Sequence, residues 1–128
     1  MDIAVNHLWK SYDGTPVLED FSCSIPRGSC CALLAPSGAG KTTLLRLLLG
    51  LEQPDQGEIT GVPHRCAAVF QEDRLIPGLS AVSNVTMAAG CSREAAAALL
   101  TELGVEADSQ TKPTALLSGG QARRTALA

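Results

Sequence analysis

The sequence has few aromatic residues, no excess of basic residues and no long uninterrupted apolar run. One tryptophan, one tyrosine and two phenylalanines make up 3% of its 128 residues, too few for a platform on which nucleic-acid bases could stack. Ten Lys and Arg residues against thirteen Asp and Glu residues give a formal net charge of −3, so no excess of basic residues is available for a phosphate backbone. The composition therefore argues against a nucleic-acid partner.

Segments that cross a membrane or direct secretion are also missing from the sequence. The longest uncharged stretch, Leu75 to Ser92, is interrupted by proline, glycine and asparagine and is too polar for a membrane span. No basic region followed by an apolar core opens the chain, so we expect no secretion signal. The five cysteines are odd in number and form no Cys-x-x-Cys pair, which predicts buried, reduced thiols in an intracellular protein.

The most informative stretch that is present is the glycine-rich segment from Ala35 to Thr43, APSGAGKTT. It follows an apolar run at 30–34 that predicts a strand covered on both faces, and it leads into an apolar helix that Gly50 ends. A strand, a glycine-rich loop and a helix in this order are the context of a phosphate-binding loop. The strict pattern has glycine where this chain has Ala35, and a positive φ there would cost an alanine about 1–2 kcal/mol.

Each residue type in this loop suits the binding of nucleotide phosphates. Gly38 and Gly40 let backbone N–H groups converge at the helix start, whose positive dipole end attracts anions. Lys41 would reach the β- and γ-phosphates, Thr42 would place its hydroxyl on Mg²⁺, and Thr43 could bond an inner phosphate. The whole predicted cradle comprises Ser37, Gly38, Ala39, Gly40, Lys41, Thr42 and Thr43. A glycine-rich turn beside a solvated lysine is the alternative.

A second pair of glycines follows a serine near the end of the sequence, in Leu117 to Gln121. Ser118 stands at an N-cap position, and Gly119 and Gly120 occupy the first turn of the helix that follows. The serine hydroxyl and the bare N–H groups of the glycines can bind a phosphate at the positive helix end. Taken alone, this pattern would be a plain helix cap, whereas beside the phosphate loop it is much more specific.

Together the two motifs resemble the nucleotide-binding domain of ATP-binding-cassette (ABC) transporters, whose signature reads Leu-Ser-Gly-Gly-Gln. The resemblance implies an α/β fold: a P-loop NTPase core with an N-terminal antiparallel β region and a helical subdomain, incomplete at the C-terminus. It implies that Ser118, Gly119, Gly120 and Gln121 bind ATP held by a second copy in a head-to-tail dimer. Gln71 then contacts Mg²⁺ and the attacking water, and Tyr12 stacks on adenine. Without the resemblance, Gln71 would be an ordinary polar residue and Tyr12 a core tyrosine.

The remaining pattern gives the expected organisation of the chain. Alternating residues at 3–9 and 21–25 predict an antiparallel hairpin, and the apolar run at 66–70 predicts another buried strand. Ser92 and Gly104 bound a predicted helix. We expect an antiparallel β region at 1–28, a phosphate-loop core at 29–73, and a helical subdomain with the signature at 74–128.

The resemblance predicts an ATP-binding subunit that couples ATP binding and hydrolysis to solute transport by a separate permease, on the cytoplasmic face of a membrane. The short loops look most like those of bacterial importers for sulfonate, nitrate, taurine or thiamine-like solutes. The family's Walker B aspartate and catalytic glutamate have no counterpart before Ala128, so we expect a truncated domain that binds ATP and Mg²⁺ without hydrolysis. The alternatives are a nucleotide-binding or interaction module without turnover, and a GTPase or small-molecule kinase, although no guanine motif Asn-Lys-x-Asp occurs.

Overall fold

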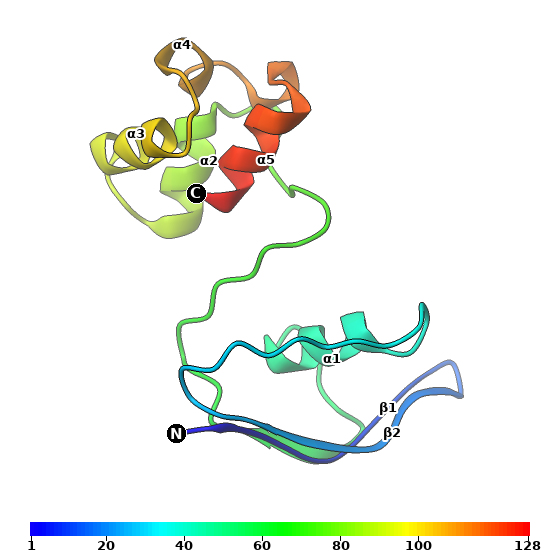
Figure 1. Ribbon diagram of the computed structural model, residues 1–128. Helices are drawn as coiled ribbons and strands as arrows, with labels where there is room; N and C mark the ends of the chain where they lie inside the picture. Colours follow the sequence, from blue (N-terminus) through cyan, green and yellow to red (C-terminus); the bar gives the residue numbers. More distant parts are fainter. The chain divides into compact units, whose positions relative to one another are not determined.

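A three-stranded antiparallel sheet dominates the first half of the computed structural model, which describes all 128 residues. Strands β1 (Ile3–Tyr12) and β2 (Thr15–Ile25) form a hairpin, and β3 (Gln56–Thr60) pairs with the other edge of β1 (Figure 1). Asp13 and Gly14 form the two-residue hairpin turn, and both have positive φ, as such a turn requires. The predicted hairpin is confirmed, with longer strands than the alternation indicated, and β3 was not predicted.

Residues with positive φ lie next to one another on all three strands. His7 of β1 and Asp20 of β2 each have a φ of 49°, and Gly57 of β3 has a φ of 88°. An extra β1 residue at His7 and an extra β2 residue at Asp20 form two bulges that offset each other in the β1–β2 register. The His7 Nδ1 atom lies 2.6 Å from an Asp20 carboxylate oxygen, and a β-carbon on Gly57 would collide with the His7 backbone. The bulges therefore bend the sheet along one line.

Helix α1 (Lys41–Leu48) packs against this sheet through one apolar side. Its Leu44 and Leu47 are buried together with Val5, Leu8 and Leu18 of the hairpin. The three-residue spacing of the two leucines puts them on the same side of a helix. The helix ends just before Gly50, which has a φ of 68°, so the predicted stop is confirmed. These elements belong to one compact unit, Met1–Ala68.

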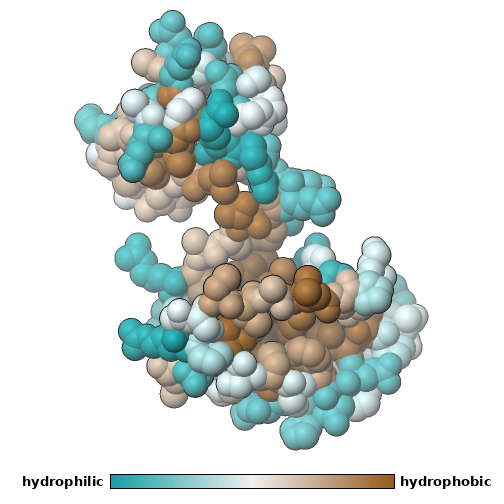
Figure 2. All heavy atoms as spheres, in the orientation of Figure 1, coloured by the Kyte–Doolittle hydropathy of each residue, from teal (hydrophilic) through white to brown (hydrophobic).

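Two predicted buried strands are absent from the structure. Residues 30–34 and 66–70 are irregular and mostly exposed, and the side chain of Leu34 is 89% exposed. A strand needs a neighbour that completes its backbone hydrogen bonds, and the sheet order β2-β1-β3 includes neither segment. Both predictions are therefore wrong for this structure. Figure 2 shows the resulting exposed apolar surface over α1 and the loop that precedes it.

The structure also corrects the prediction made for the cysteines. All five are free, but Cys30, Cys31 and Cys66 are exposed, while Cys23 and Cys91 are only partly buried. The prediction of buried thiols is wrong, because the apolar runs that carry three of them are not covered by other strands. Partial burial, followed by the neighbouring Cys31, raises the pKa of the Cys23 thiol.

The second unit, Val69–Ala128, is helical and has a core of its own. It consists of α2 (Ala81–Ala89), α3 (Arg93–Glu102), the short α4 (Ala107–Gln110), a 3-10 turn (Thr114–Leu116) and α5 (Gly119–Leu127). Its core comprises Ala81, Val82, Val85, Ala96, Leu100 and Val105. No helix in the structure has both the length and the apolar composition that a membrane crossing needs.

The helix predicted between Ser92 and Gly104 is confirmed as α3. The Ser92 hydroxyl oxygen accepts a hydrogen bond from the backbone N–H of Ala95 at 3.1 Å, which satisfies one free donor of the first turn. Glu94 lies in that turn, where a hydrogen bond from its own backbone N–H and a second one from the Ser92 hydroxyl lower the pKa of its carboxyl group. Capping chemistry in the sequence therefore placed both ends of this helix correctly.

Candidate functional site

The glycine-rich loop turns tightly just before α1. Gly38 and Gly40 each have a φ of 83°, a conformation that residues with a side chain rarely adopt. The N–H of Ala39 donates to the carbonyl oxygen of Pro36 at 3.3 Å and closes the turn. Gly40 is the N-cap of α1, and no side chain caps this helix start. The first N–H groups of α1 therefore remain free for an anionic ligand.

Lys41 folds back over the same loop. Its ammonium group donates to the carbonyl oxygen of Ala35 at 2.5 Å and to that of Pro36 at 2.6 Å. A positive charge is thus held beside the free N–H groups of the helix start, and phosphate oxygens could replace the two carbonyl acceptors. Ala35 is not among the residues with positive φ, so the missing glycine of the strict pattern causes no strain here.

The two threonines after Lys41 differ in exposure. Thr42 is exposed and makes no hydrogen bond through its hydroxyl in the structure, so this group is free to meet a ligand. Thr43 is buried, with 8% of its surface exposed. The loop therefore offers one free hydroxyl, one ammonium group and several N–H groups within a short segment.

Tyr12 lies at the end of β1 and is 38% exposed. Its hydroxyl donates to the carboxylate of Glu52, and the Lys10 ammonium nitrogen lies 5.5 Å from the ring centroid. These contacts fix the ring at the edge of the sheet and leave part of it accessible for stacking. The role of Tyr12 against adenine stays a prediction.

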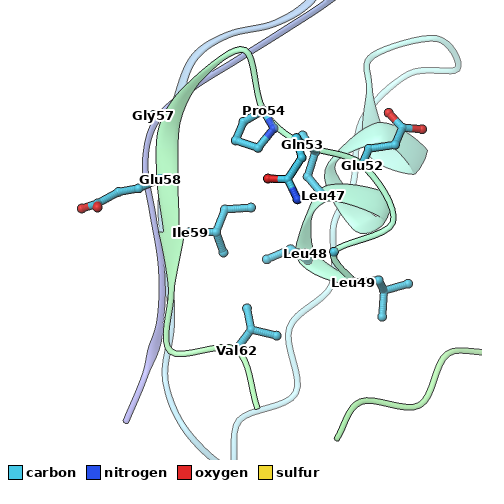
Figure 3. A pocket seen from close by; sticks show the side chains of 11 residues that line it. Leu47, Leu48, Leu49, Glu52, Gln53, Pro54, Gly57, Glu58, Ile59 and Val62 are labelled. Carbon is cyan, nitrogen blue, oxygen red and sulfur yellow. The ribbon is translucent and has the colours of Figure 1, made fainter. Parts of the chain in front are cut away.

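A cavity of about 420 Å³ in the first unit lies at the end of α1 opposite Lys41. Figure 3 shows Leu48, Ile59 and Val62 pointing into it, whereas Glu58 points away. None of the predicted cradle residues lines this cavity. Its lining includes Glu52 and Glu58 and contains no lysine or arginine, which does not suit phosphates, so the candidate nucleotide site is the glycine loop and not this cavity.

The signature segment forms a capped helix start, as predicted. The Ser118 hydroxyl oxygen accepts from the Gln121 N–H at 3.3 Å, and Gln121 Oε1 accepts from the Ser118 N–H at 3.1 Å. This reciprocal capping box begins α5. A β-carbon on Gly119 would meet nothing within 4 Å, so the space beside this helix start is open.

Gln121 has a structural role that sequence reasoning missed. Its Oε1 atom completes the capping box, and its Nε2 atom donates to the Ser109 hydroxyl at 2.9 Å. Both ends of the amide are therefore engaged within the helical unit. A capping box can be inferred from serine and glutamine three residues apart, whereas the bond to α4 has no local signal.

Gln71 is exposed on a bend at the start of the helical unit. Arg123 of α5 contacts a residue on either side of it, since one guanidinium nitrogen donates to the backbone carbonyl oxygen of Phe70 at 2.8 Å and to the side-chain carboxylate of Asp73 at 2.9 Å. The Arg74 guanidinium lies 3.6 Å from the centroid of the Phe70 ring. Sequence reasoning missed Arg123, because fifty residues separate it from Asp73.

A buried asparagine supports the segment that follows Gln71. The side-chain amide of Asn84 donates to the carbonyl oxygens of Ile76, Leu79 and Ser80, and its Oδ1 atom accepts from the Ile76 N–H at 2.7 Å. The Thr114 hydroxyl also donates to the Ile76 carbonyl oxygen, at 2.9 Å. The buried side chains of Asn84 and Thr114 thus fix the segment 76–80, which leads into α2.

The structure therefore assembles the predicted residues in two groups. The glycine loop and Tyr12 belong to the unit Met1–Ala68, whereas Gln71 and the signature belong to Val69–Ala128. Within the second unit Arg123 links the Gln71 bend to the signature helix. The geometry supports phosphate binding at the loop and a second anion site at the start of α5.

Comparison with known proteins finds relatives over nearly the whole chain. The model of the ABC transporter family matches residues 18–128. An aliphatic sulfonates import ATP-binding protein of Nocardia farcinica is 44% identical over 98% of the chain and 52% of its own length. A spermidine/putrescine import ATP-binding protein of Legionella pneumophila is 38% identical over 98% of the chain and 39% of its own length. The chain thus spans about half the length of the curated relatives it matches, and less of some.

Solved structures show the same fold. A dimeric bacterial ABC transporter cassette matches 97% of the chain and 66% of its own chain, with a TM-score of 0.81 at 25% identity. A dimeric ATP-binding cassette with bound ADP and phosphate matches 98% of the chain and 67% of its own, with a TM-score of 0.82 at 24% identity. These likenesses confirm the predicted P-loop NTPase class.

Proposed function

The chain belongs to the ABC transporter family, and on that premise we propose that it is part of an ATP-binding subunit that drives solute import through a separate permease. The resemblance inferred from the two sequence motifs is thereby confirmed. The observation that carries the proposal is the glycine loop, where Lys41 and the uncapped start of α1 present a positive charge and free N–H groups together. This arrangement suits the phosphates of ATP.

In this proposal each residue of the loop has a separate task. Gly38 and Gly40 hold the backbone curled so that its N–H groups converge, Lys41 moves from its two carbonyl acceptors to the β- and γ-phosphates, and Thr43 bonds an inner phosphate. Tyr12 stacks on the adenine ring through its exposed part.

The loop also fits Mg²⁺. The exposed hydroxyl of Thr42 has no partner within the fold and is the type of oxygen ligand that Mg²⁺ takes alongside phosphates. Exposed Gln71 supplies a second oxygen ligand and orients the attacking water. Mg²⁺ neutralises the charge that develops on the phosphates during transfer.

The open start of α5 is proposed to serve the nucleotide held by a second copy of the domain. Ser118 and Gly119 present a hydroxyl and unhindered N–H groups, while the capping box holds the helix start in shape. The dimeric state of the two solved cassettes supports this head-to-tail pairing.

An apolar groove of about 230 Å³ beside the Gln71 bend is the proposed binding site for the permease. Its lining includes Ile76 and Met87, which are 43% and 60% exposed. Met87→Glu should weaken co-purification with the permease, whereas Leu116→Glu, at a leucine outside the groove that is 72% exposed, should not. An equal loss of co-purification in both variants would contradict this binding site. Such docking keeps the chain on the cytoplasmic face of the membrane.

The relatives that are 40–44% identical are named for the import of aliphatic sulfonates. We therefore propose an aliphatic sulfonate as the transported solute. Uptake of a labelled alkanesulfonate by cells with and without the gene tests this assignment, with labelled spermidine as the comparison solute.

Calorimetric titration with Mg-ATP tests the nucleotide site directly. We expect the wild-type chain to bind ATP and Lys41→Ala to bind at least about tenfold more weakly, because the loop loses its positive charge. Lys112→Ala, which removes an exposed lysine of the helical unit, serves as the control and should keep full affinity. Unchanged affinity in a folded Lys41→Ala chain would show that the loop is not the cradle. Titration with Mg-GTP separates the proposal from a GTPase.

A further inference from the structure

One arginine of the signature helix holds both ends of the bend that carries Gln71. The Arg123 guanidinium donates to the Phe70 carbonyl oxygen at 2.8 Å and to the Asp73 carboxylate at 2.9 Å, so Gln71 and Glu72 form an arch between two fixed points. Both bonds come from the same nitrogen, and both are charge-assisted. The side chains of Arg123 and Asp73 are 42% and 31% exposed, which leaves the ion pair partly shielded from water.

The start of the same helix forms the candidate anion site. Arg123 lies four residues after Gly119, about one helical turn from the start of α5. The helix start is locked by the capping box of Ser118 and Gln121, and Gln121 is further tied to Ser109. Movement of this helix start therefore carries Arg123 with it, because one regular turn connects them.

The bend itself has few other supports. Gln71 and Glu72 are exposed, and Arg74 adopts a φ of 51°, which is unusual for a residue with a side chain. The stacking of Arg74 on the Phe70 ring, at 3.6 Å, braces the same carbonyl-bearing residue that Arg123 holds. A segment with few buried contacts takes its position from the bonds that remain.

From this geometry we infer that Arg123 is a positioning residue, which transmits the state of the signature helix to Gln71. When a phosphate engages Ser118 and Gly119, any shift of α5 moves the two points that hold the arch. The placement of Gln71 toward Mg²⁺ and the attacking water then depends on whether the signature is occupied. The inference rests on the proposed function for its consequence, whereas the clamp is a property of the helical unit alone.

Nuclear magnetic relaxation of the 15N-labelled 128-residue chain, read at the backbone amides of 71–74, tests the clamp without any nucleotide. We expect Arg123→Ala to lower the order parameters there from about 0.85, typical of rigid backbone, to below about 0.6, typical of flexible backbone. Asp73→Asn should give a smaller decrease, because the bond to Phe70 persists. Arg93→Ala, which removes an exposed arginine of α3 with one 3.4 Å contact to Ser83, is the matched control and should leave these amides unchanged. Unchanged order parameters in Arg123→Ala overturn the clamp.

Steady-state turnover of the assembled transporter, with the subunit at its native length, tests the transmission. Arg123→Lys keeps the charge but loses the planar guanidinium, and we expect it to lower kcat several-fold with the KM for Mg-ATP unchanged. A change in KM alone, or equal effects in Arg93→Ala, overturns the positioning role. No turnover in the wild-type transporter overturns the proposed function and the transmission with it, while the relaxation measurement still decides the clamp.

Discussion

Gly40 packs directly against the backbone of Val17, where an added β-carbon would lie 2.9 Å from the carbonyl oxygen. The end of the phosphate loop is thus in contact with β2, and the loop has no room for a larger residue at this point. Gly38 shares the same φ of 83° but faces open space. Gly38 is therefore needed only for its positive φ, whereas Gly40 is needed both for its positive φ and for its close packing against β2.

Substitution of these two glycines should reveal that difference. Gly38→Ala should lower the free energy of unfolding by about 1–2 kcal/mol, the cost of a positive φ alone. Gly40→Ala should lose about 1–3 kcal/mol more, because the β-carbon must also displace the Val17 backbone. Denaturant unfolding of the three proteins measures both values. Equal losses would contradict the close approach of Gly40 to β2.

Replacing Asn84 by alanine should destabilise the helical unit by about 1–3 kcal/mol, the cost of a donor left without an acceptor. The substitution leaves the Ile76 N–H without its partner and removes the amide hydrogen bonds to the Ile76, Leu79 and Ser80 carbonyl oxygens, which keep other donors. Ser83→Ala, one residue earlier on α2, removes only partly buried contacts and should cost less than about 1 kcal/mol. Thermal unfolding followed by circular dichroism compares the two. A similar loss in both would show that the asparagine network is not what fixes this segment.

Asp55 should contribute stability that is lost in acid. Its carboxylate accepts from the Ser11 N–H at 2.7 Å and from the Lys10 ammonium group at 3.1 Å, and these bonds, that to Ser11 first, lower its pKa below the usual 3.8. A lowered folded-state pKa stabilises the fold above the unfolded value and loses that contribution as the pH falls through the folded value. The difference in Tm between wild type and Asp55→Asn should therefore shrink between about pH 5 and pH 2. A constant difference across this range would contradict the assignment.

Gly119→Val should leave the fold intact while it abolishes turnover of the assembled transporter. A β-carbon at Gly119 meets nothing within 4 Å, so we expect the unfolding free energy to change by less than about 1 kcal/mol. The added methyl groups would block a phosphate from the N–H groups at the start of α5. Ala98→Val, on an exposed position of α3, is the control for added bulk in a helix. Reduced ATP affinity of the single chain would contradict service to a second copy.

Much of the local structure and of the candidate site could be predicted from the sequence, because the responsible signals are close together along the chain. Ser92 and Ser118 cap helices, Gly50 follows one, and the glycines before Lys41 take the positive φ that a phosphate loop needs. These outcomes depend on a few neighbouring residues. Their agreement with the family match explains why two short motifs identified the fold class.

The features that the sequence did not predict correctly depend on residues that are far apart along the chain. An apolar run such as 30–34 has the composition of a buried strand, but pairing depends on strands that the run itself does not specify, and none pairs with it here. The bonds from Arg123 to Asp73 and from Thr114 to Ile76 span 50 and 38 residues. Nothing in the local pattern indicates such partners, so the supports of the Gln71 bend became visible only in three dimensions.

The paired bulges at His7 and Asp20 bear on how the length of this hairpin can change during evolution. From Val5 to Lys10 on β1, and from Cys23 to Leu18 on β2, the strands advance by the same number of residues only because each contains one extra residue. Deleting His7 would leave one residue between Val5 and Leu8, opposite the single residue between Cys23 and Phe21, so regular pairing would replace the bulge and the flanking pairs would stay in register. A further shift between Lys10 and Ser11 gives β2 an extra residue that has no counterpart on β1. This hairpin should therefore tolerate single-residue changes of length at its bulges, where the flanking pairs keep their partners.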